Sequence, residues 1–87
     1  MDTKPFRDVT LQTRQIGRYL VIADTVRALR FLTDEWPGEQ TDERQAAELI
    51  CREVLEGKEP PELARLALVH AAKASGVFIA DDPRPRR

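Results

Sequence analysis

The sequence contains only one cysteine and one histidine among its 87 residues. A single cysteine excludes an internal disulfide, and one cysteine with one histidine cannot complete a zinc site. No apolar run approaches the roughly 18–20 residues that span a membrane. The first residues lack the basic and then apolar segments of a secretory signal. We therefore expect a cytoplasmic protein with no membrane segment.

Glycine-rich phosphate-binding loops and calcium-binding loops are also lacking. The glycines are isolated, and each stands where a turn or a helix end needs one: Gly17, Gly38, Gly57 and Gly76. The acidic residues of 35–43 are spread along a connection between helices, which is typical of a solvated loop. The sequence therefore predicts no cofactor and no metal site.

Charge is abundant but unevenly distributed. The 14 basic and 15 acidic residues leave a net charge of −1. Residues 1–33 carry a balance of +3, residues 34–83 carry −7, and the final four residues add +3. With 41% hydrophobic residues, the chain has the composition of a folded domain. Its length allows one domain, which we place at residues 9–80, between a flexible N-terminus (1–8) and a disordered Pro/Arg tail (81–87).

The first structured unit is predicted to be a β-hairpin. Apolar residues alternate with polar ones over residues 9–13, which is the periodicity of a strand. Residues 18–23 are rich in β-branched and aromatic side chains, and Gly17 suits the intervening turn. The second strand is apolar on both faces, with Tyr19 and Val21 on one and Leu20 and Ile22 on the other. This pattern predicts that both faces are covered.

Three helices are predicted after the hairpin. The first is capped by Asp24 or Thr25 and ends before Pro37-Gly38. The second is capped by Thr41 or Asp42 and ends at Gly57, and the third runs from Pro60-Pro61 to Gly76. The apolar stripe predicted for the first helix consists of Val26, Leu29, Leu32 and Trp36. Phe31 falls outside this stripe.

The third helix is apolar nearly all round. One stripe contains Leu63, Ala67, His70 and Ala74, and the other contains Ala64, Ala67, Leu68, Ala71 and Ser75. A helix with two apolar sides is either central in its domain or lies at an interface. Residues 77–80 form either a short third strand or an apolar segment that covers the helix end. This order of elements predicts an α+β fold, with an N-terminal antiparallel hairpin packed against three helices.

Two residues invite a test for catalysis. Cys51 and His70 are the only thiol and imidazole in the chain. Cys51 lies in the middle of a helix among apolar neighbours, where a free cysteine acts as a small buried apolar residue. His70 has no acidic residue three or four positions away to orient its ring. We therefore predict a non-enzymatic protein, with Cys51 buried and unreactive.

Arginines provide the one argument for nucleic-acid binding. Arg14 and Arg18 flank the predicted hairpin turn, and Arg27 and Arg30 share one side of the first helix. Clustered arginines can bind phosphates. A pI of about 5.8 argues against this function, because nucleic-acid-binding domains are typically strongly basic. A small regulatory nucleic-acid-binding protein is thus the alternative hypothesis.

Several short motifs together resemble a known family. They are Trp36-Pro37-Gly38, an Ala47-x-x-x-Cys51 helix followed by Gly57, and a helix with Ala64-Arg65, Leu68, Ala71-Ala72 and Gly76-Val77. This combination, over about residues 9–80, resembles the bacterial domain-of-unknown-function family 982, found mainly in rhizobia and related alphaproteobacteria. Leu68 stands where that family often has phenylalanine. The resemblance implies a small protein with no assigned activity, and it favours the second stripe of the third helix as the packed one.

The excess of two-sided apolar elements leads to our functional prediction. We expect a protein-interaction module that forms a homodimer or binds another protein, because exposed apolar patches mark interaction sites. The residues predicted for this surface are Phe31, Tyr19, Val21 and Leu68. Trp36, the largest apolar side chain in the sequence, is predicted to anchor the core at the end of the first helix.

Overall fold

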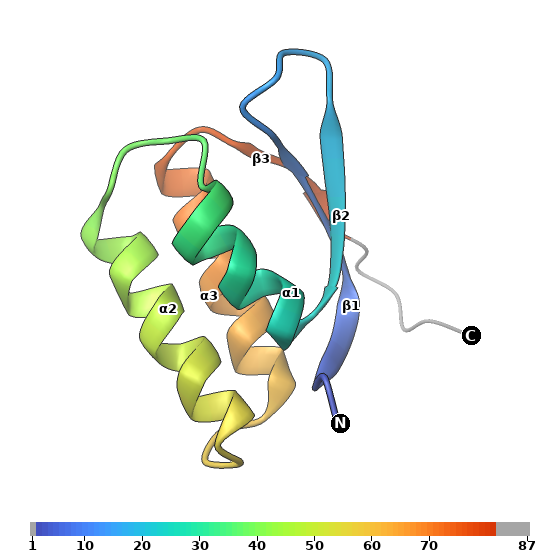
Figure 1. Ribbon diagram of the computed structural model, residues 1–87, viewed down its shortest axis with the longest axis vertical. Helices are drawn as coiled ribbons and strands as arrows, with labels where there is room; N and C mark the ends of the chain where they lie inside the picture. Colours follow the sequence, from blue (N-terminus) through green and yellow to red (C-terminus); the bar gives the residue numbers. More distant parts are fainter. Residues whose placement is uncertain (1, 82–87) are drawn as a thin grey trace.

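The computed structural model describes residues 2–81 as an α+β fold (Figure 1). Its strands are β1 (Pro5–Gln12), β2 (Tyr19–Asp24) and β3 (Phe78–Asp81). They form an antiparallel sheet in the order β2-β1-β3. The third strand, one of two possibilities for residues 77–80, is therefore present, and β1 lies at the centre of the sheet.

The first strand is longer than predicted. It begins at Pro5 rather than Val9, so that residues 5–8 of the segment predicted as a flexible N-terminus belong to the sheet. Proline is tolerated at the first position of a strand, and an irregularity in the β1–β2 register between Pro5 and Val9 interrupts the apolar alternation there. The predicted tail lies, apart from Asp81, outside the described residues.

The helices follow the predicted capping residues. Helix α1 (Thr25–Arg30) begins after Asp24, whose carboxylate accepts the N–H of Arg27 at 2.8 Å. It continues as one turn of π-helix, η1 (Phe31–Glu35), which ends at Trp36. The Thr41 hydroxyl caps α2 (Asp42–Leu55), and Pro61 opens α3 (Pro61–Ala74). Side chains that accept free N–H groups fix the starts of α1 and α2, whereas α3 begins at a proline without a side-chain cap.

All three helices lie on the same face of the sheet (Figure 1). Helices α1 and α3 pack directly on β2 and β1, and α2 packs on α1 and α3 on the side away from the strands. Helix α3 is thus central, between β1 and α2. Its packed side is the predicted second stripe, with Ala64, Leu68 and Ala71 fully buried.

The core fills the space between these layers. The sheet contributes Val9, Leu11 and Ile22, and α2 contributes Ala47, Cys51 and Val54. Trp36 closes one end, as predicted, with its ring edge-to-face with Phe31 at 5.5 Å between centroids. Position 38 requires a glycine because the loop passes close to the end of α3. A Cβ atom added there would lie 2.9 Å from the Cβ of Ser75.

Candidate functional site

The outer face of strand β2 carries two of the four residues predicted for an interaction surface, Tyr19 and Val21. Tyr19 and Val21 are 61% and 54% exposed, whereas Ile22 on the inner face is fully buried. The prediction that both faces of this strand are covered is therefore wrong for the described chain. The cause is the arrangement of layers, since every helix packs on the inner face and none on the outer one.

Two further residues of the predicted surface are buried. Phe31 is 1% exposed and Leu68 is fully buried, so neither contributes to an exposed surface of the single chain. Phe31 was predicted to lie outside the core because the predicted apolar stripe at the start of the first helix was shifted by one residue toward the C-terminus. Thr25 and Ala28, both fully buried, are the residues of α1 that face the core, whereas Val26 is 38% exposed. A stripe through Thr25 and Ala28 brings Phe31 inside.

A second apolar surface is a groove of about 290 Å³ between α2 and α3. Its lining is mostly apolar, and consists of Glu43, Ala46, Ala47, Ile50, Leu63, Leu66, Ala67 and His70. It corresponds to the first of the two stripes predicted for the third helix. His70 is exposed at this groove, while Cys51 is fully buried in the core. The two side chains are therefore in different environments.

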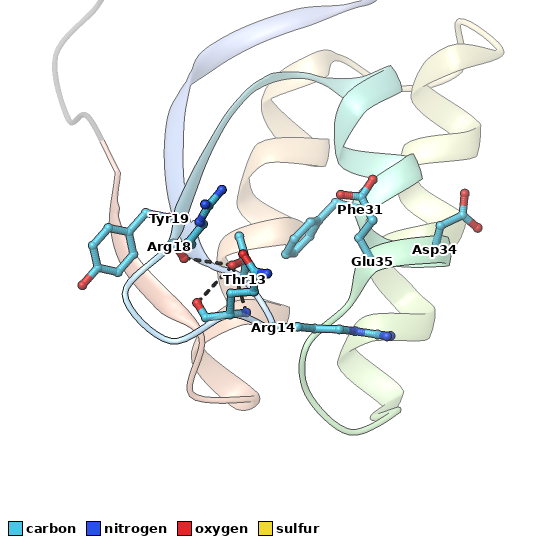
Figure 2. A pocket seen from close by; sticks show the side chains of 8 residues that line it. Thr13, Arg14, Arg18, Tyr19, Phe31, Asp34 and Glu35 are labelled. Atoms are coloured by element: carbon cyan, nitrogen blue, oxygen red, sulfur yellow. Dashed lines mark hydrogen bonds between the residues drawn. The ribbon is translucent and has the colours of Figure 1, made fainter.

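The hairpin turn and the end of the first helix enclose a shallow pocket of about 450 Å³ (Figure 2). Arg14, Arg18, Asp34 and Glu35 are the charged residues of its lining. The Phe31 ring points from the helix toward the hairpin, whereas the Tyr19 ring points away from the helix. The pocket therefore combines two cationic and two anionic side chains rather than charge of one sign.

Two of the four arginines of the nucleic-acid hypothesis make hydrogen bonds within the chain. Arg14 donates to the carbonyl oxygen of Trp36 at 3.1 and 3.3 Å. Arg27 makes two hydrogen bonds to Glu35, at 2.8 and 2.9 Å, and these bonds hold the pKa of the Glu35 carboxyl below its usual range. Arg18 and Arg30 are exposed. Two of the four are thus engaged within the chain.

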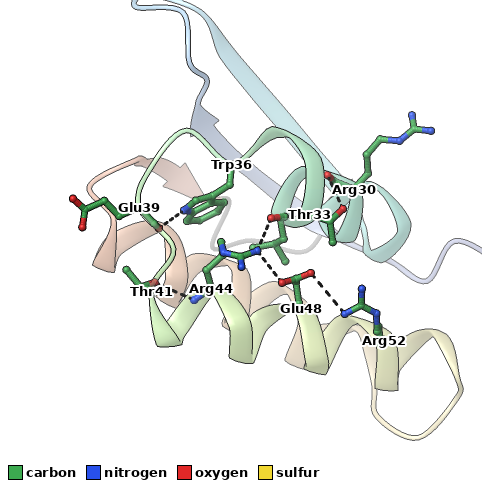
Figure 3. A network of polar contacts seen from close by, with 9 residues as sticks. Arg30, Thr33, Trp36, Glu39, Thr41, Arg44, Glu48 and Arg52 are labelled. Atoms are coloured by element: carbon green, nitrogen blue, oxygen red, sulfur yellow. Dashed lines mark hydrogen bonds and ion pairs between the residues drawn. The ribbon is translucent and has the colours of Figure 1, made fainter.

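A buried arginine on α2 was not foreseen from the sequence (Figure 3). Arg44 is only 7% exposed and donates from Nη1 to the Leu32 carbonyl at 2.9 Å and to Glu48 at 2.8 Å. Glu48 in turn lies 3.7 Å from Arg52, the pair at i, i+4 on the same helix. The carbonyls at a helix end lack intrahelical donors, so Arg44 satisfies one in the π-helical turn. The Arg44–Glu48 spacing was the available sequence signal.

The Cys51 thiol is shielded, as the sequence predicted. It is fully buried, and burial raises its pKa to about 12. Since the thiolate is the reactive form, we expect thiol reagents to label the folded protein slowly and the denatured protein rapidly. Labelling that is quenched at successive times and analysed by mass spectrometry measures both rates. Labelling as rapid in native buffer as in denaturant would contradict the burial of Cys51. Cys51→Ala should lower the free energy of unfolding by about 1 kcal/mol.

Within residues 2–81, no group of three or more histidine, cysteine, aspartate or glutamate side chains is arranged to hold a metal ion. The acidic residues of the loop before α2 are therefore not brought together there. No helix in the described part of the chain is long and apolar enough to cross a membrane.

Comparisons with known proteins support the resemblance found in the sequence. The model of a family described as "Protein of unknown function (DUF982)" matches residues 7–79. The NMR structure of the Agrobacterium tumefaciens protein Atu1219 is similar, with a TM-score of 0.76 and 25% sequence identity, over 99% of this chain and 86% of that one. No curated protein matches the chain. Neither description states an activity.

Proposed function

The chain belongs to the DUF982 family of proteins of unknown function, and we propose that it is a non-enzymatic protein-interaction module that associates with itself. The observation that carries this proposal is the exposure of Tyr19 and Val21 on the uncovered face of β2. Strand β2 lies at an edge of the sheet, so this apolar face adjoins a strand that has a neighbour on one side only. Apolar surface of this kind marks interaction sites in otherwise monomeric domains.

The composition of β2 adds support. Edge strands are commonly protected against pairing by lysine, proline or a bulge. Between Tyr19 and Ala23 the strand has no charged residue and no proline. A two-fold axis would bring the same patch on each copy together. The nucleic-acid alternative has less support, because Arg14 and Arg27 are engaged with Trp36 and Glu35.

We expect sedimentation velocity over a dilution series to show a dimer that dissociates reversibly. Replacing the outer-face side chains with smaller or more polar ones, in Tyr19→Gln/Val21→Thr, should raise the dissociation constant about tenfold or more, which corresponds to the loss of about 1.4 kcal/mol of association free energy. These side chains are exposed, so circular dichroism should show an unchanged fold.

The matched control is Leu66→Gln, which places an equally polar residue in the groove between α2 and α3. Dimerisation that responds to this variant, and not to the β2 variants, would assign self-association to the helical groove instead. A monomer at every concentration would remove the proposed function.

A further inference from the structure

The hydrogen-bonding pattern of the hairpin shows which groups of β2 face the open edge. The N–H of Thr13 donates to the carbonyl of Arg18 at 3.1 Å, and the N–H of Gln12 donates to Val77, on the side of β3, at 2.8 Å. Gln12 is opposite Tyr19 in the register. Because such groups alternate along antiparallel strands, Leu20 and Ile22 bond to β1, and the N–H and C=O groups of Tyr19 and Val21 point away from it; beyond Ile22 the register shifts toward the Pro5–Asp24 pair, which ends this alternation.

These outward groups have no backbone partner in the described part of the chain. An edge strand with free N–H and C=O groups is a template for a further strand. The same alternation puts the side chains of Tyr19 and Val21 on the uncovered face of the sheet, where both are exposed. Tyr19 and Val21 therefore combine unpaired backbone groups at the sheet edge with exposed apolar side chains.

We propose that a second copy of this chain pairs antiparallel with β2 about a two-fold axis at Val21, which joins the two sheets into one. This inference rests on the proposed self-association and assigns its geometry. In this register Val21 lies opposite the partner's Val21, and Tyr19 lies opposite the partner's Ala23. Val21 faces outward in both copies, so the central pair can exchange two N–H···O=C hydrogen bonds.

Charge complementarity selects this register. It places Arg18 opposite the partner's Asp24, and the two-fold axis forms this contact twice. Arg18 is exposed and forms no ion pair within residues 2–81. The Asp24 carboxylate uses Oδ1 to cap α1, which leaves Oδ2 for a cation. Opposite charges at facing positions stabilise a strand pair.

The other symmetric registers fit less well. An axis at Leu20 would place Arg18 opposite the partner's Ile22, and an axis at Ile22 would place Tyr19 opposite the partner's Thr25, the first residue of α1. An axis at Tyr19 would extend the pairing into the hairpin turn at Gly17, and an axis at Ala23 would extend it into Thr25 of α1. None of these registers pairs Arg18 with an acidic residue. The axis at Val21 does so, and it leaves the turn and the helix outside the pairing.

The test reverses the charge at Arg18 and then neutralises the facing charge at Asp24. Arg18→Glu places like charges opposite each other twice, and we expect it to raise the dissociation constant about tenfold in sedimentation equilibrium. Adding Asp24→Asn, whose side chain still caps the helix, should recover part of that loss. Lys58→Glu is the matched control, because it makes the same change of charge in the exposed loop between α2 and α3, and it should leave the dissociation constant unchanged.

Hydrogen exchange provides a readout that does not depend on a variant. Amides of Tyr19 and Val21 should exchange fast in dilute protein and slowly in concentrated protein, whereas Leu20 and Ile22 should be protected in both. A dimer whose Tyr19 and Val21 amides exchange equally fast at all concentrations, or whose dissociation constant ignores Arg18→Glu, would overturn this pairing and leave self-association standing. A chain that stays monomeric would overturn both.

Discussion

Trp36→Ala is expected to lower the free energy of unfolding by about 3–5 kcal/mol, as measured by urea denaturation followed by far-UV circular dichroism. Trp36 is 5% exposed and stacks edge-to-face on Phe31. Its Nε1–H also donates to the Glu39 carbonyl at 3.2 Å, which fastens the loop that leads to α2. Native domains have a total stability of about 5–15 kcal/mol, so this loss would remove most of the stability of a domain at the lower end of that range.

Two control variants separate the contributions at this position. Trp36→Phe keeps a ring against Phe31 but loses the hydrogen bond to Glu39, so it should cost about half as much or less. Tyr19→Ala removes a large aromatic side chain that is 61% exposed and should change the stability little. If Trp36→Ala and Tyr19→Ala were equally mild, Trp36 would not be the anchor of the core.

Arg44→Ala is expected to cost about 3 kcal/mol, which is the lower end of the range for breaking a buried ion pair. The variant leaves the Leu32 carbonyl without its donor and Glu48, whose side chain is 17% exposed, without its closest cation. The cost stays near the lower end because Arg52 remains 3.7 Å from Glu48. Chemical denaturation monitored by Trp36 fluorescence measures it, since that residue lies beside the same helix turn.

The matched control for this network is Arg52→Ala. Arg52 has a side chain that is 54% exposed and pairs with the same Glu48, and exposed pairs contribute at most about 1 kcal/mol. Arg44→Lys keeps the charge, but its ammonium lies on a shorter side chain and is more strongly hydrated than a guanidinium, so its effect should be intermediate. Equal effects of Arg44→Ala and Arg52→Ala would show that burial adds nothing at Arg44.

Local signals predicted most of the secondary structure. The sequence predicts Asp24 or Thr25 and Thr41 or Asp42 as helix caps, because such side chains can accept free N–H groups, and in the structure Asp24 and Thr41 do so. The β-hairpin followed from alternation and from Gly17, which has a φ of +83°. Such features depend on neighbours in the sequence, so the sequence alone is enough to identify them.

Tertiary arrangement was less accessible, and α1 shows why. Its buried side is marked by Ala28 and Thr25, a small and a polar residue that carry little hydrophobic signal. The larger Val26 and Leu29 therefore drew the predicted stripe away from the core. Phe31 was therefore predicted to lie outside the core, although it is buried. It is one of the two buried residues among the four predicted for the interaction surface. Arg44 was missed for a related reason, since its acceptor at Leu32 lies on another helix.

The order of strands in the sheet has a consequence for how the chain folds during synthesis. Strand β1 leaves the ribosome first, but its second neighbour, β3, is about 70 residues away in the chain. Until β3 arrives, one side of β1 has no partner, and the hairpin alone is only marginally stable in water. Closing such a long loop is entropically costly and slow relative to local pairing. We therefore expect nascent chains stalled before Phe78 to remain sensitive to protease, and protection to begin only when the last strand has left the exit tunnel.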